Sequence, residues 1–329
     1  MALSATSMES SGSEVLAAEE CGAAGEHYRQ TCWQVLRPYL IAQDALKPQF
    51  LAAVVLMRVT AQISPHDFLT IATEDTLPGL QVFADAWVAD HSSALHGAIF
   101  LNAMQLDLRA AWLHRQPIPR LGIGACLMKK VCTSIDDPRL WDARAIMLVA
   151  QVLRYCYGSA EDRTLDTWLD LNVQSEHWID SRPVTFDPVI DGVADREYPF
   201  GRLVYRLDIY ASAQLHYVLA RLLLVNHAPR EINSWASETR RELETRRLLK
   251  QCLAIAEGHP DNPSIVLSST LPVTRFSYAL QDPNEHKAVG RLSRCAQLSF
   301  PGLDHSTTPE MLPAGRERGQ YTASLTTGR

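Results

Sequence analysis

Apolar residues recur every three or four positions through most of this chain, which is the spacing that places side chains on one face of a helix. The first clear stripe consists of Leu95, Ile99, Ala103, Leu106, Ala110 and Leu113. A second consists of Trp141, Ala145, Leu148, Val152 and Tyr155. Later stripes consist of Val204, Leu207, Ala211, Leu215, Val218, Leu222 and Val225, and of Leu249, Cys252, Leu253 and Ala256. Each stripe predicts an amphipathic helix that packs one face against a core.

Local signals mark the ends of some of these helices. Asp137 supplies a capping carboxylate to the second helix, Pro138 suits its first turn, and Gly158 ends it. Gly258, followed by histidine and proline, closes the last of the four helices. These signals agree with the apolar periodicity, so each helix is predicted by two kinds of observation.

One segment, Pro48–Ile63, is apolar on nearly all sides, with Arg58 as its only charge. We therefore expect it to form a central buried helix. Strand-like alternation with hairpin turns is missing, as is any alternation of strands with helices. The pattern predicts an all-α fold, an irregular multi-helix bundle built as one domain or as two packed lobes.

The domain organisation follows from where the helical signal stops. Residues 1–22 have almost nothing to bury, and 304–329 are rich in Thr, Pro, Gly and Arg, so we expect a disordered leader and a disordered tail. Residues 23–303 then form the helical domain. Its main irregular connection, 179–199, is rich in Pro and Asp. This connection either divides two helical halves or packs over the core.

Composition and charge limit the class of protein. The chain of 329 residues carries 31 Lys and Arg against 37 Asp and Glu, a formal net charge of -6, so no overall positive field attracts it to nucleic acid. Its seven cysteines have irregular spacings, which favours reduced thiols, mostly buried, in an intracellular protein. The N-terminus lacks the basic start and apolar block of a signal peptide, and no apolar run approaches the roughly 20 residues of a membrane span. We expect a soluble protein.

Patterns that could support metal chemistry are weak. Asp136-Asp137 invites comparison with the Mg²⁺-binding carboxylates of helical terpene synthases, but a third carboxylate is missing where it would be expected and the proline favours a helix cap. His91 and His96 are five residues apart and face different sides of a helix. Cysteines 126 and 132 have no second pair for a zinc site, and the Gly122-Ile123-Gly124 turn follows no strand. We expect no catalytic, metal or cofactor site.

Two polar features have both a functional and a structural interpretation. The run Glu238–Lys250 alternates in sign, with Glu242 and Arg246 four apart, which favours a solvated helix face over DNA contact. The strip of Asn102, Gln105 and Arg109 lies beside an apolar helix face. It lines a ligand pocket or, more ordinarily, forms a buried hydrogen-bond network.

Several segments, in order along residues 27–300, carry a family resemblance. The most distinctive is Ser181–Pro188, with the sequence Ser-Arg-Pro-Val-Thr-Phe-Asp-Pro. The others are Leu51–Arg58, Leu77–Leu80, Leu106–Pro117, Trp141 with Tyr155–Gly158, Trp168, Trp178, Tyr198–Phe200, Tyr210 with Tyr217, Leu271-Pro272 and Asp282–Glu285. Together they resemble the helical regulatory domain of fungal zinc-cluster transcription factors, in particular the ARCA-like regulators.

The resemblance implies a role for particular residues and for the whole chain. Its motif positions, which we expect to be structural, are Arg58, Arg109, Trp168, Trp178, Arg182, Pro183, Phe186 and Pro188. The family reads DNA with a six-cysteine binuclear zinc cluster, but this chain has no Cys-x-x-Cys pair, so neither that cofactor nor direct DNA binding carries over. What carries over is a nuclear regulator of transcription, typically of a fungal secondary-metabolite gene cluster.

The partner implied is a protein, either a second copy of the chain or a DNA-binding subunit. A homodimer predicts an exposed apolar face, for example near Trp235 and Leu243. Two other classes stay open: an interaction scaffold with no role in transcription, and an all-helical biosynthetic enzyme. Nuclear localisation separates the regulator from the scaffold. Convergent carboxylates around a cavity would favour the enzyme.

Overall fold

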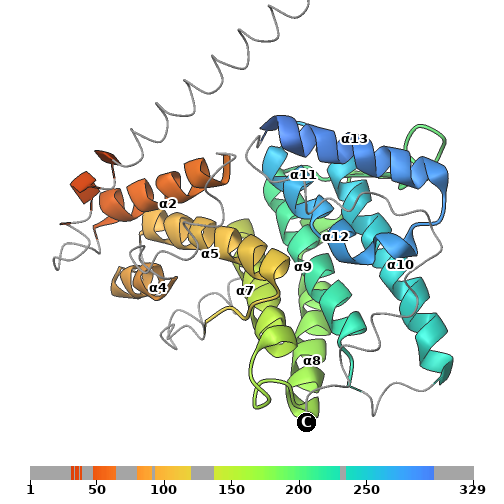
Figure 1. Ribbon diagram of the computed structural model, residues 1–329, viewed down its shortest axis with the longest axis horizontal. Coiled ribbons are helices and arrows are strands. Elements are labelled where there is room, and N and C mark those ends of the chain that lie inside the picture. Colours follow the sequence, from red (N-terminus) through yellow and green to blue (C-terminus); the bar gives the residue numbers. More distant parts are fainter. Residues whose placement is uncertain are drawn as a thin grey trace, which may run out of the picture. The chain divides into compact units, whose positions relative to one another are not determined.

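The structure is a computed structural model that describes residues 31–32, 34–36, 38, 47–63, 80–90, 93–119, 137–229 and 235–299. It is almost entirely helical in these ranges (Figure 1), which confirms the all-α prediction. The described residues fall into two compact units. The first extends to Leu106 and the second begins at Asp107, within one helix. The leader at 1–22 and the tail at 304–329 lie outside the described residues.

The first unit contains α2 (Pro48–Ile63), α4 (Leu80–Ala89) and the first part of α5 (Ala94–His114). Trp87 on α4 packs against Phe100 on α5, with ring centroids 5.1 Å apart. The predicted bounds of α2 are correct, but its predicted burial on all sides is wrong. The side chain of Leu56 is 65% exposed, because α2 packs only one face against its neighbours.

The second unit is built around α9 (Asp208–Asn226), which packs between α7 (Pro138–Tyr157) and α10 (Trp235–Gly258). As predicted, the α7 stripe is buried, Asp137 caps the helix by accepting a hydrogen bond from the Arg139 amide, and Gly158 ends it. The remaining elements are α8 (Leu165–Ser181), the 3-10 turn η2 (Val184–Phe186), α11 (Pro263–Thr270), α12 (Val273–Phe276), η3 (Ser277–Ala279) and α13 (Pro283–Ser299).

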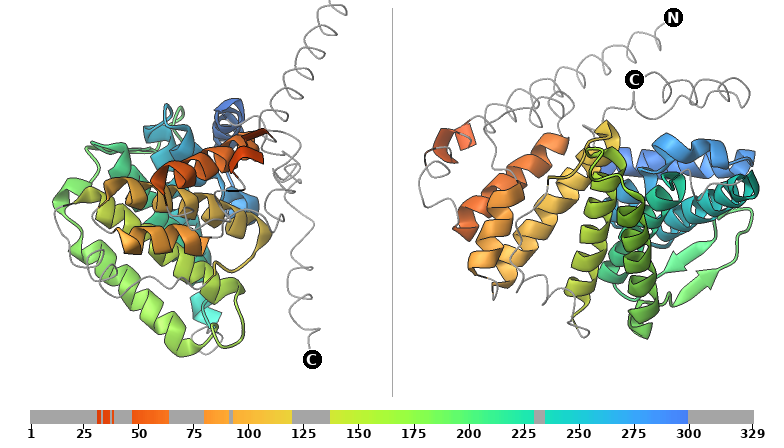
Figure 2. Two further views of the ribbon diagram at one scale, coloured as in Figure 1. Left: turned by 90° about the vertical axis from the view of Figure 1, so that its left-hand side faces the viewer. Right: turned by 90° about the horizontal axis from the view of Figure 1, so that it is seen from below.

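A two-stranded antiparallel sheet departs from the all-helical pattern that the sequence predicts. It joins β1 (Ile190–Gly192) to β2 (Arg202–Val204), with Asp191 opposite Leu203 (Figure 2). Val204 therefore lies in a strand and not at the start of the α9 stripe, as its spacing had suggested. The irregular connection 179–199 does not divide two helical halves. It lies within the second unit, between α8 and β2.

The charged run 238–250 lies on α10. Glu238, Arg240, Glu242 and Arg247 within it are exposed, which agrees with the predicted solvated face. The predicted pair of Glu242 with Arg246 is wrong. The run instead pairs at i,i+3, as in Arg247 with Glu244, while Arg246 reaches Glu285 on α13 at 3.4 Å. No helix in the described ranges is long and apolar enough to cross a bilayer.

Candidate functional site

The segment that carries the family resemblance forms a fixed turn at the end of α8. Arg182 follows the last residue of the helix, and its guanidinium pairs with the Asp187 carboxylate at 2.6 Å. Pro183 is the residue that precedes η2 and caps it, and its carbonyl accepts a hydrogen bond from the Phe186 amide at 2.9 Å. Since proline cannot continue the preceding helix, the chain leaves α8 at this point. Pro188 then leads into β1.

Phe186 anchors this turn in the core. Its side chain is only 1% exposed, and its ring centroid lies 4.5 Å from Tyr210, 6.1 Å from Trp141 and 6.4 Å from Trp178. Trp178 in turn donates from Nε1 to the Trp141 carbonyl at 3.3 Å and stacks on Tyr217 at 5.0 Å. Because α7, α8 and α9 each contribute rings, the cluster fixes where the turn lies relative to all three helices.

The structure brings together only some of the eight motif residues. Trp168 lies on α8 and donates from Nε1 to the Leu224 carbonyl of α9 at 3.1 Å, so it supports the same helix pair as Trp178. Arg109 lies elsewhere in the second unit, and Arg58 belongs to α2 in the first. Burial lowers the pKa of Arg58 to about 10, which leaves it charged at neutral pH.

Arg109 is a buried cation held by hydroxyl groups. One of its Nη atoms donates to the Ser264 hydroxyl at 2.6 Å and, more weakly, to the Ser268 hydroxyl at 3.3 Å, both on α11. Burial lowers its pKa to about 10. Arg109 thus takes part in a buried hydrogen-bond network, but this interpretation does not hold for the polar strip as a whole. Asn102 is exposed, and its amide donates to the Ala98 carbonyl at 2.8 Å within the first unit.

The sheet that follows the turn is anchored to the end of α10 by close backbone contact. A Cβ on Gly258 would lie 2.0 Å from the Leu203 carbonyl oxygen, so only glycine permits this approach. His259 accepts the Tyr205 amide hydrogen at Nε2 (3.0 Å), and its protonated Nδ1 therefore faces the Asp208 carboxylate, also at 3.0 Å. The Tyr205 bond holds the end of β2 beside the end of α10, and the Asp208 contact joins the same histidine to the start of α9.

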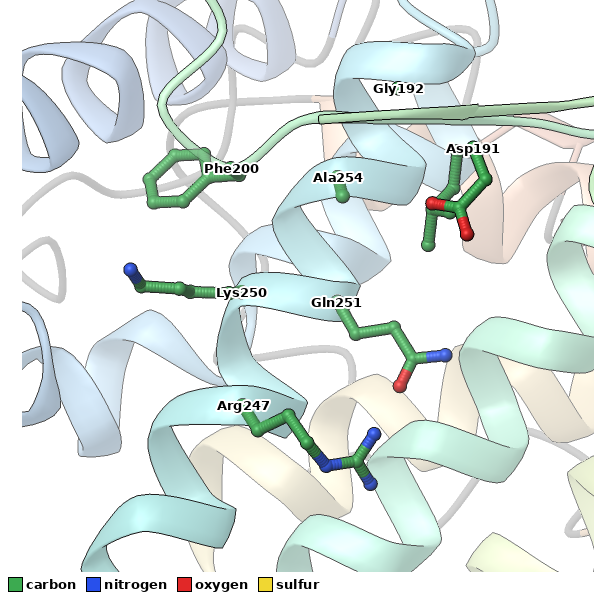
Figure 3. Close-up of a pocket in the computed structure, with 8 residues that line it drawn as sticks. Asp191, Gly192, Phe200, Arg247, Lys250, Gln251 and Ala254 are labelled. Atoms are coloured by element: carbon green, nitrogen blue, oxygen red, sulfur yellow. The ribbon is translucent and has the colours of Figure 1, made fainter. Parts of the chain in front are cut away.

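A groove of about 290 Å³ opens between this sheet and α10 (Figure 3). Arg247 and Gln251 extend from successive turns of α10 on the side where Asp191 lies, whereas Lys250 points the other way. The full lining consists of Asp191, Gly192, Phe200, Leu203, Arg247, Lys250, Gln251 and Ala254. The groove is thus lined mainly by polar groups (one carboxylate, one amide and two cations), and its apolar part is smaller.

Both cations of the groove are already paired with carboxylates. Arg247 donates to both oxygens of Glu244, at 2.9 and 2.7 Å, and this pairing raises the pKa of Arg247 and lowers that of Glu244. Lys250 lies 2.5 Å from Glu285. Burial alone would raise the pKa of Glu285, but hydrogen bonds from Lys250 and two backbone amides outweigh it and leave that pKa below its ordinary value. A ligand would meet a polarised but nearly neutral wall.

The groove is small and open to solvent. Its volume of about 290 Å³ lies just below the range of about 300 to 1,000 Å³ that is usual for ligand pockets. Asp191 and Gln251 offer hydrogen-bond acceptors, Gln251 and Arg247 offer donors, and Phe200 and Leu203 offer apolar contact. A small polar molecule with an apolar edge fits this chemistry.

A buried Asp-His-Ser cluster lies between α7 and α9, and its geometry differs from that of a catalytic triad. The Ser212 hydroxyl donates to Asp142 at 3.1 Å, and its Oγ lies farther, 3.4 Å, from His216 Nδ1. His216 Nδ1 lies 2.8 Å from the Ser212 carbonyl and 3.4 Å from Asp142. A nucleophilic serine needs its proton accepted by the histidine. This cluster instead satisfies buried polar groups where two helices pack.

The remaining candidate residues are scattered or lie outside the described ranges. Asp136, His91, the glycine pair at 122–124 and cysteines 126 and 132 are among those outside. Cys156 and Cys252 are buried, which raises the pKa of both thiols. In the ranges that the structure describes, no three His, Cys, Asp or Glu side chains gather as metal ligands would.

Sequence reasoning missed the groove, because its two walls are about 50 residues apart in the chain. The sequence pattern places Arg247 and Lys250 on a solvated helix face and Asp191 in an irregular connection. The one local signal for the site was glycine at 258, directly after the α10 stripe. Comparisons of the whole chain with known protein families, with curated proteins and with solved structures found no match.

Proposed function

We propose that this chain is a helical regulatory module that controls transcription, through a bound effector or protein partner and without reading DNA itself. The observation that carries the proposal is the ordered resemblance of segments in residues 27–300 to the regulatory domain of fungal zinc-cluster factors. By that resemblance the module acts in the nucleus, on a secondary-metabolite gene cluster.

Two features of the second unit support a binding role. The turn at 182–188, which carries the most distinctive part of the resemblance, leads directly into the sheet that forms one wall of the groove. The groove offers hydrogen-bond donors and acceptors beside a smaller apolar surface, which suits a small polar effector. An effector that binds there would act by favouring one position of the sheet over another.

The proposal is tested by deleting the gene and measuring transcripts of its chromosomal neighbours. Expression of several neighbours should change together. A second assay joins the full chain to a heterologous DNA-binding domain and measures a reporter gene, which should change several-fold relative to the DNA-binding domain alone.

The same experiments separate the competing functions. A fluorescently tagged chain that stays out of the nucleus under inducing conditions would support an interaction scaffold. Unchanged neighbours, together with accumulation of one metabolite intermediate, would indicate an enzyme and contradict the proposal.

A further inference from the structure

The outer face of α8 combines exposed aliphatic side chains with carboxylates. Leu165, Leu169 and Val173 are spaced by four and are 39%, 45% and 61% exposed. At about 100° per residue these three lie within the same arc of about 140° as the four carboxylates of the helix. Those carboxylates belong to Asp166, Asp170, Glu176 and Asp180, all of them exposed.

The opposite face of α8 is firmly held, so the outer face is presented by a fixed helix. Leu171 and Trp178 are buried against α7 and α9. Arg221 of α9 donates to the Asn172 amide oxygen at 2.6 Å and to the Ser175 hydroxyl at 2.9 Å. Figure 2 shows α8 along the outside of the second unit. A partner would therefore meet a preorganised surface, which lowers the entropy cost of binding.

The charge of this face is not neutralised within the described part of the chain. The helix contains no Lys or Arg, and none of its four carboxylates forms an ion pair with a described residue. Asp170 and Glu176 accept hydrogen bonds only from the neutral amides of Gln174 and Asn172, at 2.7 and 2.8 Å. Carboxylates alone would suffice to keep a helix face solvated. A row of three exposed aliphatic side chains among them is instead typical of a surface that contacts another molecule.

We propose that the outer face of α8, defined by Leu165, Leu169, Val173 and the four carboxylates, is the docking surface for a different protein. That protein presents an apolar groove bordered by Lys and Arg side chains. The proposal rests on the proposed function and gives it a partner of defined chemistry. Helix-in-groove recognition uses anchors at this spacing, and the carboxylates supply complementary charge at the rim.

The same charge argues against a second copy of this chain as the occupant. Pairing two α8 faces about a two-fold axis would set four carboxylates against four others, with no cation on either helix to offset them. Like charges placed opposite each other across an interface oppose binding. A homodimer, if one forms, must use another face.

The test places a photo-reactive phenylalanine derivative at Val173 in the full chain, expressed in its own cells, and identifies the crosslinked peptide by mass spectrometry. We expect a peptide of another protein, with Lys or Arg flanking apolar residues. Two variants are compared: Leu169→Ser, and the charge reversal Asp166→Lys with Asp170→Lys. Each should lower the crosslink yield by about tenfold, as loss of an interface anchor typically does.

The matched control is Leu56→Ser on α2, which removes an aliphatic side chain that is 65% exposed and should leave the yield unchanged. Equal unfolding temperatures of all variants establish that the fold is intact. A crosslink to the same chain, no crosslink, or a yield insensitive to both α8 variants would overturn the proposal. If the crosslink behaves as expected but the tethered reporter does not change, the docking surface stands and the role in transcription fails.

Discussion

Replacing Phe186 by alanine tests whether the family-like turn is held by the aromatic cluster. The ring is 1% exposed and is surrounded by Trp141, Trp178 and Tyr210, with the nearest ring centroid 4.5 Å away. Alanine removes the six ring carbons and leaves a void that three large rings on separate helices cannot readily fill. The backbone turn itself, which depends on Pro183, is not altered.

The expected loss follows from burial and cavity formation together. Truncation of a buried phenylalanine to alanine costs about 3–5 kcal/mol. In a unit of this size each kcal/mol corresponds to about 2–4 °C in the unfolding temperature, so Phe186→Ala should unfold about 6–20 °C lower than the unchanged chain. Phe186→Leu, which keeps much of the apolar volume, should lose clearly less.

The assay is thermal and urea unfolding followed by near-ultraviolet circular dichroism, to which the cluster's tryptophans contribute. Val184→Ala in the same turn is the control, because that side chain is 82% exposed and its loss should change stability by less than about 0.5 kcal/mol. If Phe186→Ala and Val184→Ala differ by less than about 1 kcal/mol, the ring does not anchor the turn and the reasoning is wrong.

Three further predictions concern the groove and the core. Gly258→Ala should cost about 1–3 kcal/mol and speed amide hydrogen exchange in β2, because the added Cβ would lie 2.0 Å from the Leu203 oxygen. Glu285→Gln should cost about 1–3 kcal/mol at pH 7. That difference should shrink as the pH falls below the ordinary carboxyl pKa of 4.5, since the folded pKa is lowered and its stabilisation is lost on protonation. Iodoacetamide should leave Cys156 and Cys252 unmodified in the folded chain and label both in denaturant, because burial raises the pKa of each thiol.

A different result would contradict each of these three predictions. Gly290→Ala, at an open position of α13 where the nearest atom to a Cβ is 3.6 Å away, should be neutral or stabilising, so equal losses at both glycines would contradict the close approach at 258. A pH-independent loss in the Glu285 variant would mean that its charge is not stabilising. Modification of the buried thiols at the rate of exposed ones would show that the core opens readily.

The helices were predictable because their signals are local. In α7 the apolar period, the Asp137 cap, the proline and Gly158 all lie within 22 residues and agree, so no distant contact was needed to find its bounds. The same reasoning found both ends of α2 but overestimated its burial. An all-apolar segment gives no direction to a hydrophobic face, and only its neighbours decide that Leu56 faces solvent.

The sheet and the groove were unpredictable because they depend on contacts between distant residues. Val204 fits a helical stripe in sequence, yet it pairs with Ile190. Its strand is held in place by His259 and by the close backbone approach at Gly258. Gly201 has a positive φ of 75°, which turns the chain into β2. The presence of a glycine in the sequence does not by itself predict that conformation. Buried polar partners are equally non-local, since Arg109 bonds to serines more than 150 residues away.

The groove and the outer face of α8 are both connected to the turn that Phe186 anchors. A coupling between the two proposed binding surfaces can therefore be tested. The inner side of α8 contacts Phe186 through Trp178, and the turn that Phe186 anchors continues into the sheet that forms one wall of the groove. Coupling between two sites is reciprocal, so a groove ligand that strengthens docking on α8 must itself bind more tightly to the docked form, by the same factor.

Phe186→Leu separates this coupling from stability, because leucine keeps the fold while loosening the contact between the helix and the turn. In that variant hydrogen exchange at the Tyr205 amide, which reports on the groove wall through its bond to His259, should rise. The crosslink yield at Val173 should stay close to that of the unchanged chain without a groove ligand, since the outer face of α8 is not altered. If the variant lowers the crosslink as strongly as Leu169→Ser does, the turn fixes α8 itself and the two surfaces are one site.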